Sequence, residues 1–338
     1  MIQTCQNYDL SARNTFALAV KCKRWVEYDS ADDLPLVVGS MTAGEKWVHI
    51  GAGSNMLFLG DYDGTVVHSA VRGIDFTDAD GCVLVRACSG EPMDAVVAEC
   101  CRRNLWGLEN LSGIPGEAGA SAVQNVGAYG VEAADVIESI EAFDCERMQA
   151  VVFDPSVCGY AYRDSMFKHS PAKGRYIITA VTYRLTAAPA PHTDYPALRD
   201  LLPHTPASPA EVRAAVIAIR DSKLPDPSRV PSAGSFFKNP VVSRETYEQV
   251  CAAAGADVKV PCYETDDGVK IPAAWLIDRC GWKGTVMGNA AVWHLQPLVL
   301  TNPERKATPD EIVKLEAAIA ATVRERFGVE LTPEVEHV

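Results

Sequence analysis

The sequence lacks the features typical of membrane proteins, disulfide scaffolds and zinc proteins. It has no uncharged apolar run near the roughly 20 residues that a membrane-spanning helix needs, and Met1 to Phe16 lack the apolar stretch of a signal peptide. The eleven cysteines include no CxxC pair, and the seven histidines form no HExxH motif. We therefore expect a cytoplasmic protein with reduced thiols, no membrane insertion and no bound metal.

Positive charge is also scarce. The chain has 31 Lys and Arg residues against 44 Asp and Glu residues, for a net charge of −13. Such a surface repels a phosphate backbone, so we expect no nucleic-acid partner. A small anionic ligand would need a local cluster of cations and backbone N–H groups.

The residue patterns that are present favour an α+β protein of more than one domain. A chain of 338 residues exceeds one typical core. Strands grouped early, with helices appended and no regular βαβ alternation, favour an α+β architecture. The predicted strands are Trp47–Ile50, Thr65–Ser69, Cys82–Ala87 and Tyr176–Leu185. The predicted helices are Glu91–Asn104 and those that follow the capping boxes Ser208–Glu211 and Thr308–Glu311, the last ending at Gly328.

Two glycine-rich loops have the chemistry of an anion cradle. The first contains Gly51, Gly53, Ser54 and Asn55 after a strand-like run, where small residues leave backbone N–H groups uncovered. It lacks the third glycine and the following helix of a Rossmann fingerprint. The second, Gly113 to Gly130, holds five glycines and a Gln-Asn pair, so we expect neither a good helix nor a good strand there. Together the loops suit a dinucleotide.

Several further motifs resemble one known family. These motifs are Gly159-Tyr-Ala-Tyr-Arg-Asp-Ser165, Gly234-Ser-Phe-Phe-Lys-Asn-Pro240, Ala274-Trp-Leu-Ile-Asp278 and Pro333-Glu-Val335. In this order and spacing, from about Asn14 to Glu334, the chain resembles the UDP-N-acetylenolpyruvoylglucosamine reductase (MurB) family. Its length and a loop at Tyr195 resemble the first of the two family types.

The resemblance implies a fold and a division into domains. The fold is the FAD-binding fold shared with p-cresol methylhydroxylase and vanillyl-alcohol oxidase, in two lobes, plus a third, smaller α+β substrate-binding domain. We expect lobe 1 at residues 1–72 joined by about 322–338, lobe 2 at 73–222 and the substrate domain at 223–321. The proline-rich stretch Lys223–Pro231 is typical of such a boundary.

The resemblance also implies a reaction. NADPH would reduce non-covalently bound FAD, which would then reduce the enolpyruvyl ether of UDP-N-acetylglucosamine to UDP-N-acetylmuramate for peptidoglycan synthesis. Ser235 matches the proton donor, Arg163 the group that holds the substrate carboxylate, and Glu334 the third catalytic residue. The cofactor residues carried over are Gly51, Gly53, Ser54, Asn55, Ile114, Gly116, Ser121, Gln124, Asn125, Gly127 and Tyr129. The substrate-binding residues carried over are Tyr195, Lys223, Asn239, Lys283 and Gln296.

One departure and two alternatives accompany this interpretation. Glu117 brings a charge into the second loop, where the family usually has a small or apolar residue, near the expected cofactor diphosphate. One alternative is another flavoprotein of this fold that oxidises a small alcohol. The Arg163, Ser235 and Glu334 set disfavours it, because alcohol oxidation needs a base rather than a proton donor. The other alternative is a non-catalytic nucleotide-sugar or flavin-binding module, which would be colourless if it bound a UDP-sugar without flavin.

Overall fold

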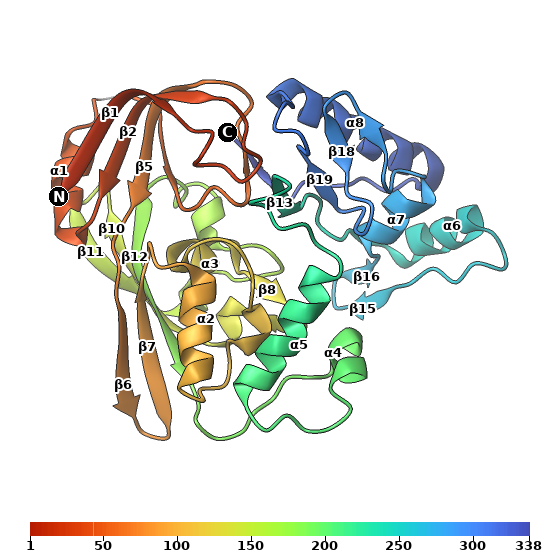
Figure 1. The fold of residues 1–338 in the computed structure, drawn as a ribbon, viewed down its shortest axis with the longest axis horizontal. Helices are drawn as coiled ribbons and strands as arrows, with labels where there is room; N and C mark the ends of the chain where they lie inside the picture. Colours follow the sequence, from red (N-terminus) through yellow and green to blue (C-terminus); the bar gives the residue numbers. More distant parts are fainter. Residues whose placement is uncertain (43) are drawn as a thin grey trace. The chain divides into compact units, whose positions relative to one another are not determined.

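The computed structural model describes residues 1–42 and 44–338, and these residues form two compact units (Figure 1). Unit 1 comprises Met1–Tyr8, Cys22–Ala52 and Tyr62–Arg220. Unit 2 comprises Asp9–Lys21, Gly53–Asp61 and Asp221–Val338. The expected division into two FAD-binding lobes and a substrate-binding domain stays a prediction.

The first sheet of unit 1 has four strands in the order β1 (Ile2–Asp9), β2 (Lys21–Tyr28), β5 (Tyr62–Ser69) and β3 (Trp47–Ile50). Strand β5 runs parallel to both β2 and β3. Its residues Gly64 to Ser69 are all buried, as is typical of a central parallel strand that is covered on both faces. Helix α1 (Leu34–Gly39) buries Leu34 and Val37 together with Val26 and Tyr28 of β2.

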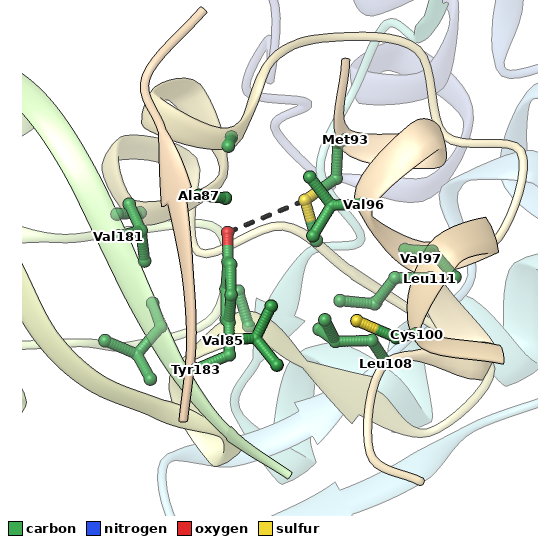
Figure 2. Packing of buried hydrophobic residues seen from close by; sticks show 14 of the residues in the cluster. Val85, Ala87, Met93, Val96, Val97, Cys100, Leu108, Leu111, Val181 and Tyr183 are labelled. Carbon is green, nitrogen blue, oxygen red and sulfur yellow. Dashed lines mark hydrogen bonds between the residues drawn. The ribbon is translucent and has the colours of Figure 1, made fainter. Parts of the chain in front are cut away.

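The second sheet of unit 1 is antiparallel and has five strands. Their order is β11 (Gln149–Phe153), β10 (Ile137–Asp144), β12 (Tyr176–Leu185), β7 (Cys82–Cys88) and β6 (Ile74–Ala79). Helix α2 (Met93–Arg102) places its apolar stripe in the same core cluster as the inner residues of this sheet. Figure 2 shows the hydroxyl of Tyr183 pointing at the sulfur of Met93, 3.6 Å away.

The remaining elements of unit 1 are helices α4 and α5, a short hairpin and several short 3-10 helices. Helix α5 (Pro209–Asp221) and the short helix α4 (Pro196–Leu201) bury their apolar residues with Trp106 in a separate cluster. Strands β8 (Gly127–Ala128) and β9 (Val131–Glu132) form a small hairpin. The 3-10 helices are η1 (Ala31–Asp33), η2 (Glu109–Leu111), η3 (Ala133–Asp135), η4 (Pro155–Val157) and η5 (Met166–Lys168).

Unit 2 contains three small sheets and three helices. One sheet has the order β13 (Ser232–Ser235), β19 (Val299–Thr301), β18 (Ala290–Val292) and β17 (Val286–Met287). A second has the order β14 (Val241–Val242), β16 (Gly268–Lys270) and β15 (Tyr263–Thr265). In the third, β20 (Glu336–His337) pairs in parallel with β4 (Met56–Leu57). The helices are α6 (Arg244–Ala254), α7 (Ala273–Arg279) and α8 (Pro309–Phe327).

The structure confirms most of the predicted elements and corrects one. The four predicted strands match β3, β5, β7 and β12, and the predicted helices match α2, α5 and α8. The capping box of α8 forms at Thr308, and the helix ends at Gly328 in the left-handed conformation. The expectation that Gly113 to Gly130 would form no helix is wrong, because helix α3 (Ala118–Gln124) lies within it.

Among the residues that the structure describes, no helix is long and apolar enough to cross a membrane. Within residues 1–42 and 44–338, no group of three or more His, Cys, Asp and Glu side chains is arranged to hold a metal ion.

Candidate active site

The glycine-rich segment Gly113–Gly130 is held against α2 and β7 by backbone hydrogen bonds. Gly119 packs so closely on Ser89 that an added Cβ would lie 2.8 Å from the Ser89 Cβ. Glycine at position 119 therefore allows helix α3 to pack directly against Ser89. The contacts are Met93 N–H to Gly116 O at 3.0 Å, Ala118 N–H to Glu91 O at 2.8 Å, Gly119 N–H to Ser89 O at 3.0 Å, and Gly113 N–H to the Asp94 carboxylate at 2.6 Å.

Asn125 fixes the end of helix α3. It adopts a left-handed conformation with φ of 43°, as C-terminal caps commonly do. Its Nδ2 donates to Glu132 Oε2 at 2.8 Å and to the Ala161 carbonyl at 2.9 Å, and its Oδ1 accepts from the Ala134 N–H at 3.0 Å. These contacts tie the glycine-rich segment to the segment that carries Arg163.

Arg163 lies against the backbone of that same segment. Its Nη2 donates to the Gly127 carbonyl, and its Nη1 lies 3.4 Å from the Asn125 carbonyl and 3.5 Å from Glu132 Oε1. A Cβ added at Gly127 would lie 2.7 Å from the Arg163 Nη1, so this approach requires glycine. The neighbouring Asp164 pairs with His169, with an N–O distance of 2.7 Å. Unit 1 thus brings Arg163 together with Asn125 and Gly127.

Tyr129 and Tyr195 also meet in unit 1. Their rings are edge to face, with centroids 5.3 Å apart. Burial raises the pKa of Tyr129, so its phenol stays protonated. Asn110 connects the two segments, because its Nδ2 donates at 2.9 Å both to the Tyr129 carbonyl and to the His192 carbonyl.

The other predicted cofactor residues of this segment face the interior of unit 1. Ser121 is buried, with its hydroxyl 2.7 Å from that of Tyr183. The Gln124 Oε1 accepts from Lys168 Nζ at 2.9 Å. Ile114 packs against the core cluster that contains α2, and Gly116 has a φ of 125°, which favours glycine.

Gly51 lies directly against the unusual residue Glu117. A Cβ added at Gly51 would lie 3.0 Å from Glu117 Oε2. Glu117 is only 8% exposed, and its Oε1 lies 3.1 Å from Nε2 of His68. The Glu117 carboxylate, which departs from the family pattern, therefore points inward. It contacts His68, which in turn contacts Glu27.

Unit 2 brings Ser235, Asn55 and Glu334 together. Ser235 ends β13 after Gly234, whose φ is +71°, and pairs with Val299. The backbone N–H of Glu334 donates to the Phe236 carbonyl at 2.8 Å. Asn55 Nδ2 donates to the Glu334 carbonyl at 3.1 Å. The proposed proton donor and the proposed third catalytic residue therefore lie on adjoining backbone segments.

The turn that contains Gly53 also belongs to unit 2. Its φ is +64°, and an added Cβ would lie 2.1 Å from the Arg13 carbonyl oxygen. The Gly53 carbonyl accepts from the Thr15 N–H at 3.2 Å. Ser54 follows in the same turn, between Gly53 and Asn55. This position therefore requires glycine both for its conformation and for its close packing.

The predicted substrate-binding residues of unit 2 differ in their exposure and in their contacts. Asn239 Oδ1 accepts from the Ala273 N–H at 2.9 Å, at the start of α7. The Lys223 carbonyl accepts from Trp293 Nε1 at 3.0 Å, and the Lys223 side chain is exposed. Gln296 lies between β18 and β19, with its Oε1 3.3 Å from the Leu298 N–H. Lys283 is exposed in the turn before β17, and no described contact ties it to the others.

The residues present fit a bound FAD. Gly53, with a φ of +64°, and Gly116, with a φ of +125°, hold conformations that favour glycine, and such turns present backbone N–H groups that suit a diphosphate. Unit 2 supplies the side-chain amide of Asn55, and unit 1 supplies that of Gln124. The site residues carried over from the family divide between the units: Gly51, Arg163 and residues 113–130 lie in unit 1, and Gly53, Ser235 and Glu334 lie in unit 2.

The sequence analysis did not identify the residues that hold the glycine-rich segment in place. Asp94 contacts Gly113 and Asn110 contacts Tyr129 at separations of 19 residues, His68 contacts Glu117 at a separation of 49, and no local pattern indicates these pairs. The unexpected charge of Glu117 is the one signal that could have led to His68, because a buried carboxylate needs a compensating group.

Comparison with known proteins gives the family directly. A family model described as UDP-N-acetylenolpyruvoylglucosamine reductase, C-terminal domain, matches residues 226–338. A second, described as FAD binding domain, matches residues 23–147 and confirms the predicted cofactor.

Individual relatives extend the match to nearly the whole chain. The UDP-N-acetylenolpyruvoylglucosamine reductase of Bacteroides fragilis (strain YCH46) is 43% identical, covering 98% of this chain and 99% of that protein. That of Porphyromonas gingivalis (strain ATCC 33277) is 41% identical, covering 98% of each.

A solved structure agrees on the fold. The UDP-N-acetylenolpyruvylglucosamine reductase (MurB) from Thermus caldophilus matches with a TM-score of 0.67 and 21% identity, covering 100% of this chain and 98% of that one. The predicted α+β, FAD-binding fold is thereby confirmed. From the identity and coverage of these relatives, the chain belongs to the UDP-N-acetylenolpyruvoylglucosamine reductase (MurB) family of flavin-dependent oxidoreductases.

Proposed function

We propose that this chain uses NADPH to reduce UDP-N-acetylenolpyruvoylglucosamine to UDP-N-acetylmuramate, a step of peptidoglycan precursor synthesis. The observation that carries the proposal is the match to reductases of that name over 98% of the chain. Bound FAD supplies hydride transfer from the nicotinamide to the terminal alkene carbon of the enolpyruvyl group. In balance, NADPH and one proton are consumed, and NADP⁺ and the saturated ether are released.

Ser235 is the proposed source of the proton that the neighbouring alkene carbon receives. A hydroxyl is uncharged at neutral pH, so it can lie close to an apolar alkene and still donate. Its place at the end of β13, paired with Val299, supports the role, because the strand pairing fixes the backbone that carries the side chain. Glu334, anchored next to Phe236, is proposed to assist at the stage when negative charge develops.

Arg163 is the proposed clamp for the substrate carboxylate. A guanidinium can hold both carboxylate oxygens and stabilise charge that spreads onto them. Its contacts to the Gly127 and Asn125 carbonyls support the role, because they hold the side chain in one orientation beside the proposed cofactor segment.

The proposal assigns the remaining residues to binding. The glycines and amides of residues 51–55 and 113–130 would hold FAD, as the family resemblance implies. Tyr195, Lys223, Asn239, Lys283 and Gln296 would bind the diphosphate and nucleotide of the substrate. We place the enzyme in the cytoplasm, and the free state of all eleven cysteines supports a reducing compartment.

Purified protein tests this function in a steady-state assay. NADPH oxidation, followed by absorbance, should depend on added UDP-N-acetylenolpyruvoylglucosamine, and mass spectrometry should identify the saturated product. NADH in place of NADPH is the matched control for the proposed donor. Oxidation of NADPH that is independent of the sugar nucleotide would contradict the proposal.

A further inference from the structure

A buried histidine lies between two carboxylates in unit 1. Nδ1 of His68, on strand β5, is 2.9 Å from Oε2 of Glu27 on β2. Its Nε2 is 3.1 Å from Oε1 of Glu117, the residue before helix α3. The side chains of His68 and Glu117 are 6% and 9% exposed, respectively. The three residues form one connection from the parallel sheet to the glycine-rich segment, here called the Glu–His–Glu bridge.

The geometry of this bridge favours an extra proton. An ionised carboxylate accepts hydrogen bonds but donates none, and a neutral imidazole has a single N–H. With both carboxylates ionised, a neutral His68 would turn a lone pair toward one of them in a buried site, which is costly. An imidazolium donates to both carboxylates, and its charge offsets one of them. The arrangement therefore favours His68 in its doubly protonated form.

The other groups around His68 are neutral. The ring of Trp25 on β2 stacks on it, with centroids 5.5 Å apart. Burial, and next the charge of His68, lower the pKa of His49 on β3 to about 3, so His49 stays uncharged. The hydroxyl of Tyr28 lies 3.2 Å from His49 Nε2, and burial raises the pKa of Tyr28. Glu27 and Glu117 are thus the charged groups that face His68.

Glu117 places the bridge beside the proposed cofactor loop. Its Oε2 lies 3.0 Å from the position that a Cβ on Gly51 would take, and the Ala120 Cβ lies 3.7 Å from that same position. An uncompensated carboxylate here would repel the diphosphate of FAD, and the repulsion would be strong because the site is buried. The charge of His68 reduces that penalty, and its hydrogen bond keeps Glu117 packed against Gly51.

We propose that His68 is a positioning residue for FAD. As an imidazolium, it holds Glu117 against the turn at Gly51 and offsets negative charge beside the cofactor diphosphate. The inference rests on the proposed placement of Gly51 in the FAD site.

Titration of the flavin-free full-length protein with FAD, followed by flavin fluorescence, tests this proposal. His68→Gln, which cannot carry the charge, should bind FAD about tenfold more weakly than wild type.

Glu117→Gln separates this role from a merely structural one. It keeps the shape of the side chain but removes the charge that His68 offsets, so it should bind FAD as tightly as wild type. The double variant with His68→Gln should regain the affinity that the single His68→Gln loses. Glu141→Gln, which breaks the 2.6 Å pair with Arg86 in the same unit, is the control and should keep the wild-type affinity.

Three results would overturn the proposal: wild-type affinity in His68→Gln, no recovery of affinity in the double variant, or a thermal shift in these variants without any change in FAD binding. If His68→Gln does not fold, Glu117→Gln decides, because weaker FAD binding by this variant would refute the role of His68. Tight FAD binding by wild type that neither substitution changes would refute the role of His68 and leave the reductase function intact. Wild-type protein that binds no FAD at all would refute the proposed function itself.

Discussion

The backbone N–H of Glu334 donates to the carbonyl of Phe236, the residue after Ser235, at 2.8 Å. The Asn55 side chain holds the Glu334 carbonyl from the other side at 3.1 Å, and Phe237 forms an isolated bridge with Pro333. Two proposed catalytic residues, 99 positions apart in the sequence (334 minus 235), thus lie on segments that a backbone hydrogen bond and the Asn55 side chain hold in place. Positions held in this way can be tested by substitutions that leave the backbone in place.

Ser235→Ala should separate the two half-reactions. Reduction of the flavin by NADPH should stay nearly unchanged, since it needs no proton from Ser235. Reoxidation by the enolpyruvyl substrate should slow by about a hundredfold or more, because a positioned acid is lost. Stopped-flow absorbance measures both rates. Ser243→Ala, at the start of the exposed helix α6, is a matched control. Equal slowing of both half-reactions would remove Ser235 from this role.

Arg163→Lys should behave as a non-conservative change. An ammonium cannot hold both oxygens of the substrate carboxylate, so kcat/KM should fall by about a hundredfold. The ratio of FAD to protein should be measured as well, since Arg163 also contacts the Gly127 carbonyl. Arg244→Lys, in an exposed pair with Glu264, is the control. Full turnover by Arg163→Lys would show that the carboxylate is held elsewhere.

Gly53→Ala should weaken both folding and FAD binding. The new Cβ would lie 2.1 Å from the Arg13 carbonyl oxygen, so the turn must shift. Gly81→Ala is the control, because its φ of +73° imposes a similar conformational cost of about 1 kcal/mol while no atom lies within 4 Å of the added Cβ. Urea unfolding and FAD content after gel filtration measure the difference. Equal effects of the two substitutions would mean that the close approach at Gly53 is unimportant.

Acid should destabilise unit 1 partly through Asp144. This buried carboxylate accepts from Arg175 at 2.6 Å, and that bond, with the N–H groups of Arg147 and Glu146, lowers its pKa to about 2. The folded pKa lies below the unfolded value of about 3.9, so the stabilisation is present above about pH 4 and is lost as pH falls toward about 2.

Unfolding of Asp144→Asn as a function of pH measures this contribution. The variant should be less stable than wild type at neutral pH and should show a shallower loss of stability below about pH 4. Asp63→Asn, whose side chain is 90% exposed, is the control. An identical acid profile in wild type and Asp144→Asn would assign the acid sensitivity to other groups.

Local patterns predicted elements better than they predicted contacts. Strands with clear boundaries, such as β12, and helices with strong caps, such as α8, were found because alternation and capping act over a few residues. Helix α3 was missed because the glycines on either side of it suggested a loop, whereas Ala118–Gln124 itself has one glycine and three alanines, which favour a helix. The family resemblance supplied the candidate residues, but the contact of His68 with Glu117 joins positions 49 apart and follows no local pattern.

The most direct test of the proposed function is a single anaerobic mixing experiment. Protein whose flavin has been reduced by NADPH is mixed with UDP-N-acetylenolpyruvoylglucosamine in the absence of oxygen. Rapid return of the oxidised flavin absorbance, with UDP-N-acetylmuramate formed in equal amount, is the predicted result. Flavin that stays reduced until oxygen is admitted would contradict it.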